Sequence, residues 1–289
     1  MKIVLSPNPY RDKGLKTAQA AARILNNAQV ETRICLPFPV EGSNIEFPKH
    51  VQLSSMEEEL PGADILVCFG GDGTILHSAK DANAHGGIPV LGVNLGSVGF
   101  MAEVEQSELP LLSKLAVGKY TVESRMMLDV AVKREGRTIF SDLALNDAVI
   151  TKGAVARVVE MEVRSDRVPI TSYSGDGVII STPTGSTAYS MSAGGPIVEP
   201  TAENIILTPI CPHSIISARS FVLDHRRTLT VRVKDLSRKT AYLSVDGGKA
   251  FRLRGGDQLQ IRCSETKTHL VRLTNRSFYE IVTQKLGRM

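Results

Sequence analysis

The sequence predicts two domains: an α/β domain with a mostly parallel sheet, followed by an all-β, mainly antiparallel domain. The first third of the chain alternates strand and helix patterns, which favours parallel βα units. The remainder carries short extended segments separated by glycine-containing turns, which is typical of antiparallel sheets. The length of 289 residues also fits about two domains.

Residues 1–119 are predicted to form the α/β domain. Ile65–Phe69 is a continuous apolar run of the kind that is buried on both faces of a sheet. The predicted strands are Lys2–Ser6, Val30–Leu36, Ile65–Phe69 and Ile88–Val93. The predicted helices are Asp12–Asn27, a helix that begins at Thr74, and Ser107–Val117, with Ser107 as cap and Gly118 as terminator. This alternation predicts a Rossmann-like, three-layer domain.

Residues 120–274 are predicted to form the β-rich domain. Glu135-Gly136, Asp246-Gly247 and Gly255-Gly256 are typical of tight turns between antiparallel strands. The predicted strands are Met127–Lys133, Thr138–Leu145, Val155–Val163, Val178–Ser181, Thr228–Lys234, Ala241–Val245, Ala250–Leu253, Gln258–Cys263 and His269–Leu273. A last helix is expected over Ser277–Leu286, and we expect residues 275–289 to pack back on the first domain.

Composition and charge exclude several classes of function. No apolar run reaches the ~18 to 20 residues that a membrane span needs, so no membrane partner is expected. The net charge of +4 is spread along the chain, which suits small anionic ligands and argues against nucleic acid. The N-terminus turns polar too early for a signal peptide, so we expect a cytoplasmic protein. The four cysteines form no CxxC pair, and a metal site built on cysteine is not expected.

The sequence GGDGT, Gly70–Thr74, directly follows the apolar strand Ile65–Phe69. Its glycines allow close approach of a ligand, and their N–H groups at a helix N-terminus form a natural phosphate cradle. Asp72 is an anion among these donors, which makes sense if it holds a cation or takes a proton from an attacking hydroxyl. The loop has neither the GK[ST] ending of a Walker A motif nor the third glycine of a Rossmann fingerprint. The alternative is a plain strand-to-helix turn that Asp72 caps.

A second candidate site is the segment Ser174–Pro196, which is dense in Ser, Thr and Gly. Small hydroxyls and free amides suit sugar hydroxyls and phosphate oxygens, and Tyr189 offers a flat face to a base. The alternative is a polar linker. The pair Asn146-Asp147 ends an apolar segment and suits adenine edges and ribose hydroxyls, although the start of a turn explains a bare dipeptide equally well.

Over most of its length the sequence resembles the NAD kinase family. The residues that carry the resemblance are Gly70–Thr74, Asn94–Met101, Asn146-Asp147, Ser174–Pro196 and Leu207–Arg219. GGDGT alone is shared with lipid kinases and 6-phosphofructokinases. The segment Thr182–Tyr189, TPTGSTAY, followed by AGGP, is far more specific.

The resemblance implies a role for each matching residue. Asp72 is expected to be the general base that deprotonates the 2′-hydroxyl of the adenosine ribose of NAD, with Gly71 and Gly73 shaping the loop that receives phosphates. Asn146 and Asp147 are expected to bind the adenine and ribose, and Asp176 the nicotinamide end. The residues expected to wrap the dinucleotide are Thr187, Ala188, Tyr189, Ser190 and Ser192. His77 and Arg157 fall where family members often place a basic side chain near phosphates.

The resemblance also implies ATP, or in some members polyphosphate, as phosphoryl donor, a divalent metal ion (Mg²⁺ or Mn²⁺), and a homodimer or homotetramer. No protein ligand of the metal is indicated. The family's Asn-Glu pair is Asn146-Asp147 here, one methylene shorter, and we expect the carboxylate to keep its role. Many members have Gln two residues after the Asp aligned with Asp246, where this chain has Gly248.

Two other functions compete with an NAD kinase. A lipid kinase shares GGDGT, but it leaves the Thr182–Pro196 segment unexplained. A non-catalytic NAD(H)-binding regulator explains that segment, but it has no need of a carboxylate in its phosphate loop. We therefore expect a kinase that phosphorylates NAD.

Overall fold

The computed structural model divides into two compact units of nearly equal length. The N-terminal unit comprises Met1–Ser124 and Thr268–Met289, and the C-terminal unit comprises Arg125–Lys267. The structure describes residues 1–40, 45, 47–96, 99–153, 158–213, 219–234, 236 and 240–287. The unit boundaries fall within two long strands, β7 (Thr121–Arg134) and β18 (Gln258–Arg272). Because these strands continue across the boundaries, no turn marks them, whereas sequence analysis places the boundaries at 119/120 and 274/275.

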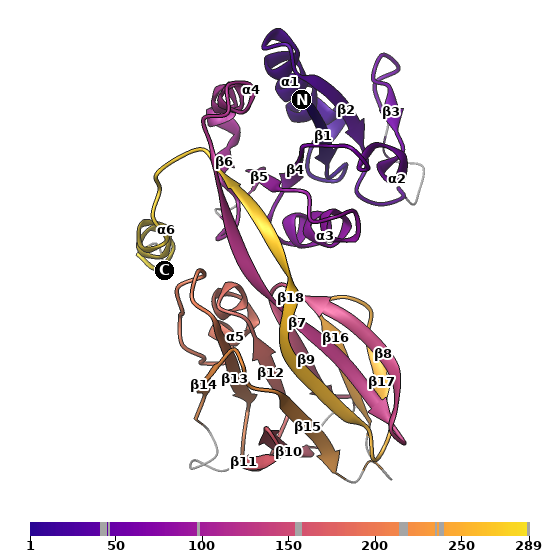
Figure 1. The fold of residues 1–289 in the computed structure, drawn as a ribbon, viewed down its shortest axis with the longest axis vertical. Coiled ribbons are helices and arrows are strands. Elements are labelled where there is room, and N and C mark those ends of the chain that lie inside the picture. The colour runs from indigo at the N-terminus through magenta and orange to yellow at the C-terminus, as the bar shows by residue number, and fades with distance from the viewer. Residues whose placement is uncertain are drawn as a thin grey trace. The chain divides into compact units, whose positions relative to one another are not determined.

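The N-terminal unit is built on a parallel sheet (Figure 1). Its strands are β1 (Lys2–Pro7), β2 (Glu31–Cys35), β3 (Leu53–Ser54), β4 (Ile65–Gly70), β5 (Val90–Asn94) and β6 (Val104–Glu105). The order is β3-β2-β1-β4-β5, and β6 and the end of β18 also pair with β5. All these pairs are parallel. The carboxyl ends of β1, β4 and β5 therefore meet at one edge of the sheet.

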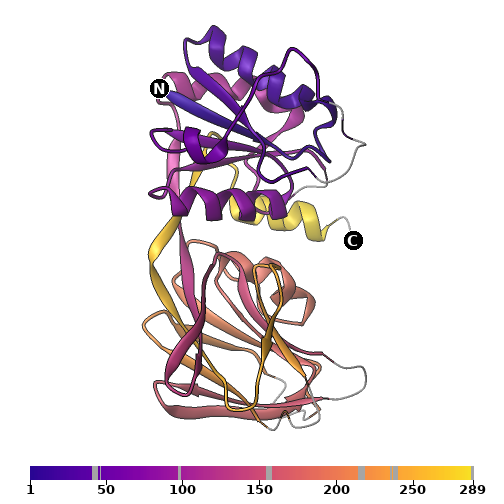
Figure 2. The same ribbon diagram turned by 90° about the vertical axis from the view of Figure 1, so that its right-hand side faces the viewer.

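Helices cover both faces of this sheet, as Figure 2 shows. The helices of the unit are α1 (Lys16–Asn27), the short α2 (Met56–Glu59), α3 (Asp72–Ala84), α4 (Ser113–Ala116) and, after β18, α6 (Phe278–Leu286), with 3-10 turns η1 (Lys13–Leu15) and η2 (Gln106–Leu112). The core on the α1 face contains Ala18, Ala21 and Leu25 of α1 together with Ile3 and Leu5 of β1. On the face of α3, Ile75 and Ala79 are buried. Strands buried on both faces explain the continuous apolar runs of the sequence.

The end of the chain is tied to the N-terminal unit by buried polar contacts. Glu103 is 5% exposed; its carboxylate accepts the backbone N–H groups of Leu273 and Thr274 at 2.9 and 2.7 Å and pairs with Arg272 at 3.1 Å. The following helix α6 begins with a capping box between Ser277 and Glu280. These contacts place α6 within the N-terminal unit.

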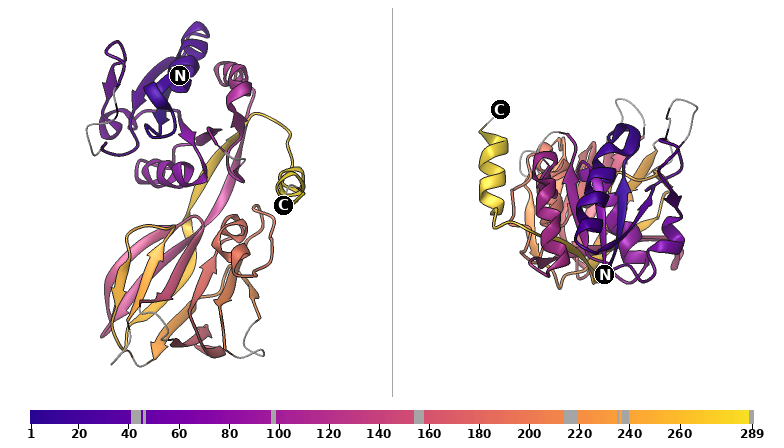
Figure 3. Two further views of the ribbon diagram at one scale, coloured as in Figure 1. Left: turned by 180° about the vertical axis from the view of Figure 1, so that it is seen from behind. Right: turned by 90° about the horizontal axis from the view of Figure 1, so that it is seen from above.

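The C-terminal unit contains two antiparallel sheets, which Figure 3 shows from behind. One sheet has the order β11-β10-β15-β18-β7-β8 and the other β14-β13-β12-β9-β16-β17. The remaining strands are β8 (Arg137–Ala144), β9 (Asp147–Lys152), β10 (Val159–Ser165), β11 (Val168–Gly175), β12 (Gly177–Ser181), β13 (Asn204–Ile210), β14 (Phe221–Asp224), β15 (Leu229–Lys234), β16 (Ala241–Val245) and β17 (Phe251–Leu253). The turns η3 (Thr184–Thr187) and α5 (Tyr189–Ser192) follow β12.

The core of this unit lies between the two sheets. Alternate residues of facing strands, such as Leu128 and Val130 of β7 and Ile150 of β9, are buried in one cluster. This alternation is what a sheet with one buried face requires. The predicted fold class, a mostly parallel α/β domain plus an antiparallel all-β domain, is confirmed.

Several predicted elements differ from the observed ones for local reasons. α3 begins at Asp72, two residues before Thr74. The helix expected at Ser107 begins instead after Glu105, which forms a capping box with Glu108, and its first part is a 3-10 turn that contains Pro110. The two strands expected in 258–273 are one strand, β18, because no turn interrupts them. Part of the predicted strand Val155–Val163 lies outside the described residues.

No helix among the described residues is long and apolar enough to cross a membrane.

Candidate active site

The loop Gly70–Thr74 lies at the carboxyl edge of the parallel sheet. Gly70, the last residue of β4, is paired with Asn94, the last residue of β5, and Pro7 of β1 lies beside Phe69. Gly71 is the N-cap residue of α3. Ligands of open parallel sheets bind at the carboxyl ends of the strands, and the first N–H groups of a helix have no intrahelical acceptor. The geometry therefore suits an anion such as a phosphate.

The glycines of this loop serve two different purposes. A Cβ atom at Gly70 would lie 2.2 Å from the Thr74 hydroxyl, so the fold itself requires glycine there. A Cβ atom at Gly71 or Gly73 would meet nothing within 4 Å, and Gly71 has an ordinary extended φ of −109°. No contact with a described residue of the N-terminal unit explains these two glycines. A ligand that approaches the backbone closely does explain them.

The carboxylate of Asp72 is held by the chain that follows β5. Its Oδ2 accepts the backbone N–H of Phe100 at 2.9 Å, and its Oδ1 accepts that of Met101 at 3.2 Å. A Cβ atom at Gly99 would lie 2.1 Å from Oδ1, so glycine is required there. Each carboxylate oxygen keeps a second acceptor site. Asp72 is therefore positioned as an acceptor for a further proton.

Other side chains fix the same edge. The Asn8 amide donates to the Thr74 hydroxyl at 3.1 Å, and the buried Asn94 amide donates to Glu105 at 3.0 Å. His77 lies one turn along α3 from the loop and pairs with Asp81 at 3.2 Å. The hydrogen bond to Asp81 raises the pKa of His77, against the opposing effect of burial. His77 is therefore a cation candidate on α3, already shared with Asp81.

In the C-terminal unit, Asn146 and Asp147 lie at the start of β9, beside the ends of β12 and β16. Asp147 is paired with Ser181, and Ala148 with Val245. The carboxylate of Asp246 accepts three backbone N–H groups at 2.7–2.9 Å, those of Leu145, Asn146 and Asp147. Asp246 and Gly247 both have positive φ, 48° and 70°, as the predicted tight turn requires. This turn carries the carboxylate that fixes the Asn146-Asp147 pair.

The carboxylate-bearing residues Asp147, which is buried, and Asp246, which is half-buried, therefore lie side by side. Asp147 is 5% exposed, and burial, with the charge of Asp246 as a second cause, raises its pKa from 3.8 to about 7. Burial also raises the pKa of Asp246, opposed by its three backbone hydrogen bonds. Those hydrogen bonds favour the ionised form of Asp246. Asp147 is thus the member of the pair that holds a proton near neutral pH.

The segment after β12 packs directly on Asn146. The Thr182 hydroxyl donates to the Leu145 carbonyl at 2.6 Å and accepts the N–H of Gly185 at 3.0 Å. A Cβ atom at Gly185 would lie 2.1 Å from the Asn146 carbonyl oxygen. The side-chain oxygen of Asn146 is buried and accepts no hydrogen bond from any residue that the structure describes. An unsatisfied buried acceptor is costly, and a ligand donor would satisfy it.

The residues expected to wrap a dinucleotide form the turns η3 and α5. Tyr189 is 44% exposed, Ser192 is exposed, and Thr187 and Ala188 are half-buried. Ser190 is fully buried and its hydroxyl bonds to that of Thr208 at 2.8 Å. Tyr189 is therefore free to stack, whereas the Ser190 hydroxyl is engaged inside the unit.

Asp176 lies at the other end of the same sheet. It precedes β12 and forms an ion pair with Lys152, the last residue of β9, at 2.6 Å. Asp147 begins β9, so the two aspartates are separated by roughly 17 Å, the length of the strand. A ligand that contacts both would have to extend along β9.

The matches to known proteins follow the same division. Residues 4–118 match the ATP-NAD kinase N-terminal domain, and residues 145–273 match the ATP-NAD kinase C-terminal domain. The NAD kinase of Acetivibrio thermocellus is 38% identical over 291 residues, with 99% of this chain and 97% of that protein covered. The chain belongs to the NAD kinase family. The resemblance read from the sequence is confirmed.

Further members of the NAD kinase family show the same relationship. The NAD kinase of Geobacter sulfurreducens is 45% identical over 233 residues, which cover 79% of this chain and 80% of that one. The crystal structure of yeast NADH kinase complexed with NADH has a TM-score of 0.83 at 25% identity and covers 99% of this chain and 87% of that one. An Archaeoglobus fulgidus NAD kinase in complex with ATP has a TM-score of 0.76 at 26% identity, with both chains fully covered.

The expected site residues of this NAD kinase family member form one group in the N-terminal unit, whereas in the C-terminal unit Asp176 lies at the opposite end of β9 from Asn146 and Asp147. Gly71, Asp72, Gly73 and His77 lie together in the N-terminal unit, and Arg157 lies outside the described residues. No local sequence pattern identifies Gly99, Gly185 or Asp246 as site residues, because their contacts join segments far apart in the chain. The signal available for Asp246 was its place in an Asp-Gly turn.

The described part of the chain contains no cluster of three or more His, Cys, Asp or Glu side chains able to hold a metal ion. A cavity of about 590 Å³ lies beside α1 and β2 and includes none of the expected site residues. Its Arg33 is paired with Glu31 at 2.7 Å. We therefore assign the site from the loop and strand-end geometry.

Proposed function

We propose that the chain transfers the terminal phosphate of ATP to the 2′-hydroxyl of the adenosine ribose of NAD, to give NADP. The observation that carries the proposal is Asp72, a carboxylate held at the entrance of a glycine loop whose Gly71 and Gly73 face open space. The same reaction could use polyphosphate in place of ATP as donor, or NADH in place of NAD as acceptor. An assay with each substrate distinguishes these cases.

The N-terminal unit supplies the chemistry in this proposal. The backbone N–H groups of Gly71 and Gly73, at the start of α3, bind the phosphates of the donor. Asp72 accepts the proton of the 2′-hydroxyl while the 2′-oxygen forms its bond to the terminal phosphorus and the bond from that phosphorus to the leaving ADP oxygen breaks. A positioned general base contributes typically ~10²- to 10⁴-fold, and positioning and electrostatics the larger part.

The C-terminal unit supplies recognition of NAD. The unsatisfied Asn146 oxygen accepts from the adenine amino group or a ribose hydroxyl. Asp147, protonated near neutral pH, donates a hydrogen bond as well as accepting one. Tyr189 offers its ring to a base, while Thr187, Ala188, Ser190 and Ser192 shape the turn around it. Asp176, with Lys152, contacts the nicotinamide end.

A divalent cation enters this proposal with the donor. Mg²⁺ usually keeps several waters and is held by one or two carboxylates plus substrate phosphates, and a protein-built cage does not fit the described residues. We propose that Mg²⁺ or Mn²⁺ arrives bound to ATP and neutralises phosphate charge. We further propose a cytoplasmic homodimer or homotetramer. The four free cysteines are in keeping with a reducing compartment.

A coupled assay with purified protein, NAD, ATP and Mg²⁺ tests the function by measuring NADP. Parallel reactions replace ATP with polyphosphate, NAD with NADH, or NAD with a diacylglycerol. NADP formation is the expected result. Phosphorylation of the lipid alone would favour a lipid kinase, and NAD binding without turnover would favour a regulator.

A further inference from the structure

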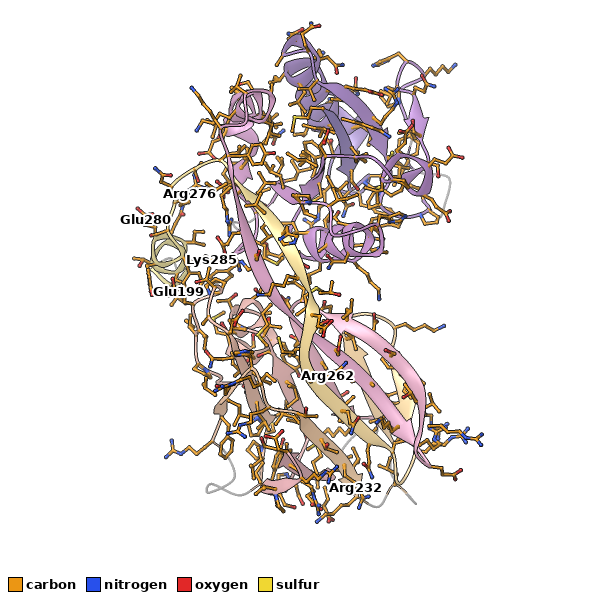
Figure 4. The ribbon with its side chains drawn as sticks, viewed as in Figure 1. Glu199, Arg232, Arg262, Arg276, Glu280 and Lys285 are labelled. Carbon is orange, nitrogen blue, oxygen red and sulfur yellow. The ribbon has the colours of Figure 1, made fainter. Side chains whose placement is uncertain are left out.

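Lys285 of α6 lies on the same face of the helix as the buried Ile281 and contacts Phe100 of the N-terminal unit. It follows the buried Ile281 by four residues, which places both side chains on one face. Its Nζ lies 3.9 Å from the centroid of the Phe100 ring. Figure 4 labels Lys285 on α6, with Arg276 before the helix; Arg276 pairs with Glu108 at 2.9 Å. The contact with the ring places the Lys285 ammonium group over Phe100.

Phe100 is also the residue that holds Asp72. Its backbone N–H donates to the Asp72 carboxylate at 2.9 Å, while its ring lies under the Lys285 ammonium group. Burial lowers the pKa of Lys285, and the charge of Asp72 acts in the opposite direction. The ammonium group is therefore within electrostatic reach of the carboxylate in the phosphate loop.

The loop itself has no cation. Gly70–Thr74 contains no Lys or Arg, unlike a Walker A loop, whose lysine binds the β- and γ-phosphates. His77 on α3 is already paired with Asp81. A phosphoryl group transferred beside Asp72 would lie near a carboxylate, and an adjacent ammonium group offsets that repulsion.

We propose that Lys285 binds the phosphates of the donor and stabilises the phosphoryl group during transfer. The proposal rests on the proposed function. The ammonium group donates hydrogen bonds to non-bridging phosphate oxygens and transfers no proton, because the proton of the attacking hydroxyl goes to Asp72. The new P–O bond and the departing ADP oxygen are those of the proposed reaction. The cation–π contact with Phe100 keeps the ammonium group in place.

Lys285→Met and Lys285→Arg test this role, with Gln284→Met, on an exposed position of the same helix, as control. We expect Lys285→Met to weaken ATP binding about tenfold by calorimetry without NAD, which corresponds to the loss of one charged hydrogen bond. We also expect kcat to fall about 10- to 100-fold. Lys285→Arg should recover most of both losses. The affinity for NAD and the Tm should match those of Gln284→Met.

Two results would overturn the proposal. One is ATP affinity and kcat in Lys285→Met equal to those of Gln284→Met. The other is a loss that extends equally to NAD affinity and Tm, which would show that Lys285 only seats α6. Because ATP binding is measured without turnover, a wild-type chain that binds ATP but forms no NADP would refute the proposed function and leave the Lys285 comparison interpretable.

Discussion

The carboxylate of Asp246 accepts the backbone N–H of Asp147 at 2.9 Å, so two acidic residues lie together at the start of β9. Asp246 is stabilised as an anion by three backbone N–H donors, and Asp147 is buried beside that anion. The pKa of Asp147 rises to about 7 as a consequence. Asp147 of the folded chain therefore titrates near neutral pH and holds its proton below it.

We expect Asp147→Asn to change how stability depends on pH. The folded chain keeps the Asp147 proton up to about pH 7, whereas the unfolded chain releases it near 3.8. Between these values the unfolded state binds fewer protons, so the free energy of unfolding falls as pH rises and levels off above the folded pKa. The free energy of unfolding declines by at most roughly 4 kcal/mol, because each unit of difference between the folded and unfolded pKa corresponds to about 1.36 kcal/mol.

Urea unfolding near pH 5 and pH 8 measures this effect. Asparagine resembles the protonated acid, so the variant should be modestly more stable than the wild type at the lower pH, and this difference should grow at the higher pH. Asp129→Asn, which removes a partly exposed carboxylate of the same unit, is the control. Parallel pH dependences for wild type and Asp147→Asn would contradict the assignment of the proton to Asp147.

We expect Asp246→Ala to weaken NAD binding and to leave ATP binding unchanged. The variant removes the acceptor of three N–H groups that fix Leu145, Asn146 and Asp147, at a cost of about 1–3 kcal/mol for each donor left unsatisfied. Asp246→Asn keeps an acceptor oxygen and should lose less. Calorimetric titration with NAD and with ATP measures the change in affinity for each nucleotide. Unchanged affinity for NAD in the alanine variant would show that Asp246 does not position the pair.

The role of Asp246 depends on a contact between distant segments, which local sequence patterns do not predict. The strand Ile65–Phe69 and the loop Gly70–Thr74 are local patterns, and both are found where their periodicity and glycines predict. The contact from Asp246 to Leu145 spans 101 residues, and no local pattern reports it. Similarly, Asp72 is evident as a carboxylate in a glycine loop, but its bond to Phe100 depends on how the chain returns after β5. The helix start at Glu105 differs from the expected Ser107 because an acidic capping box competes with a serine cap.

We expect Asp72→Asn to lower kcat by about two to four orders of magnitude while NAD still binds. The amide retains one oxygen acceptor for the Phe100 or Met101 N–H group but cannot accept the proton of the attacking hydroxyl. Gly99→Ala provides an independent route to the same loss, because its Cβ would lie 2.1 Å from the Asp72 Oδ1 and displace an unaltered carboxylate. Steady-state kinetics and NAD titration check both. Near-normal turnover in Asp72→Asn would remove Asp72 from the role of general base.

The glycines of the loop should respond to alanine in opposite ways. Gly73→Ala places a methyl group in open space within the first turn of α3, where alanine is the better helix former, so the free energy of unfolding should stay the same or rise by up to roughly 1 kcal/mol. ATP affinity should nevertheless fall, because that open space is where the phosphates approach the backbone. Gly70→Ala should instead destabilise the N-terminal unit, since its Cβ would lie 2.2 Å from the Thr74 hydroxyl. Thermal unfolding with and without ATP separates the two effects. A Gly73→Ala variant with wild-type ATP affinity would mean that phosphates do not approach the loop at this position.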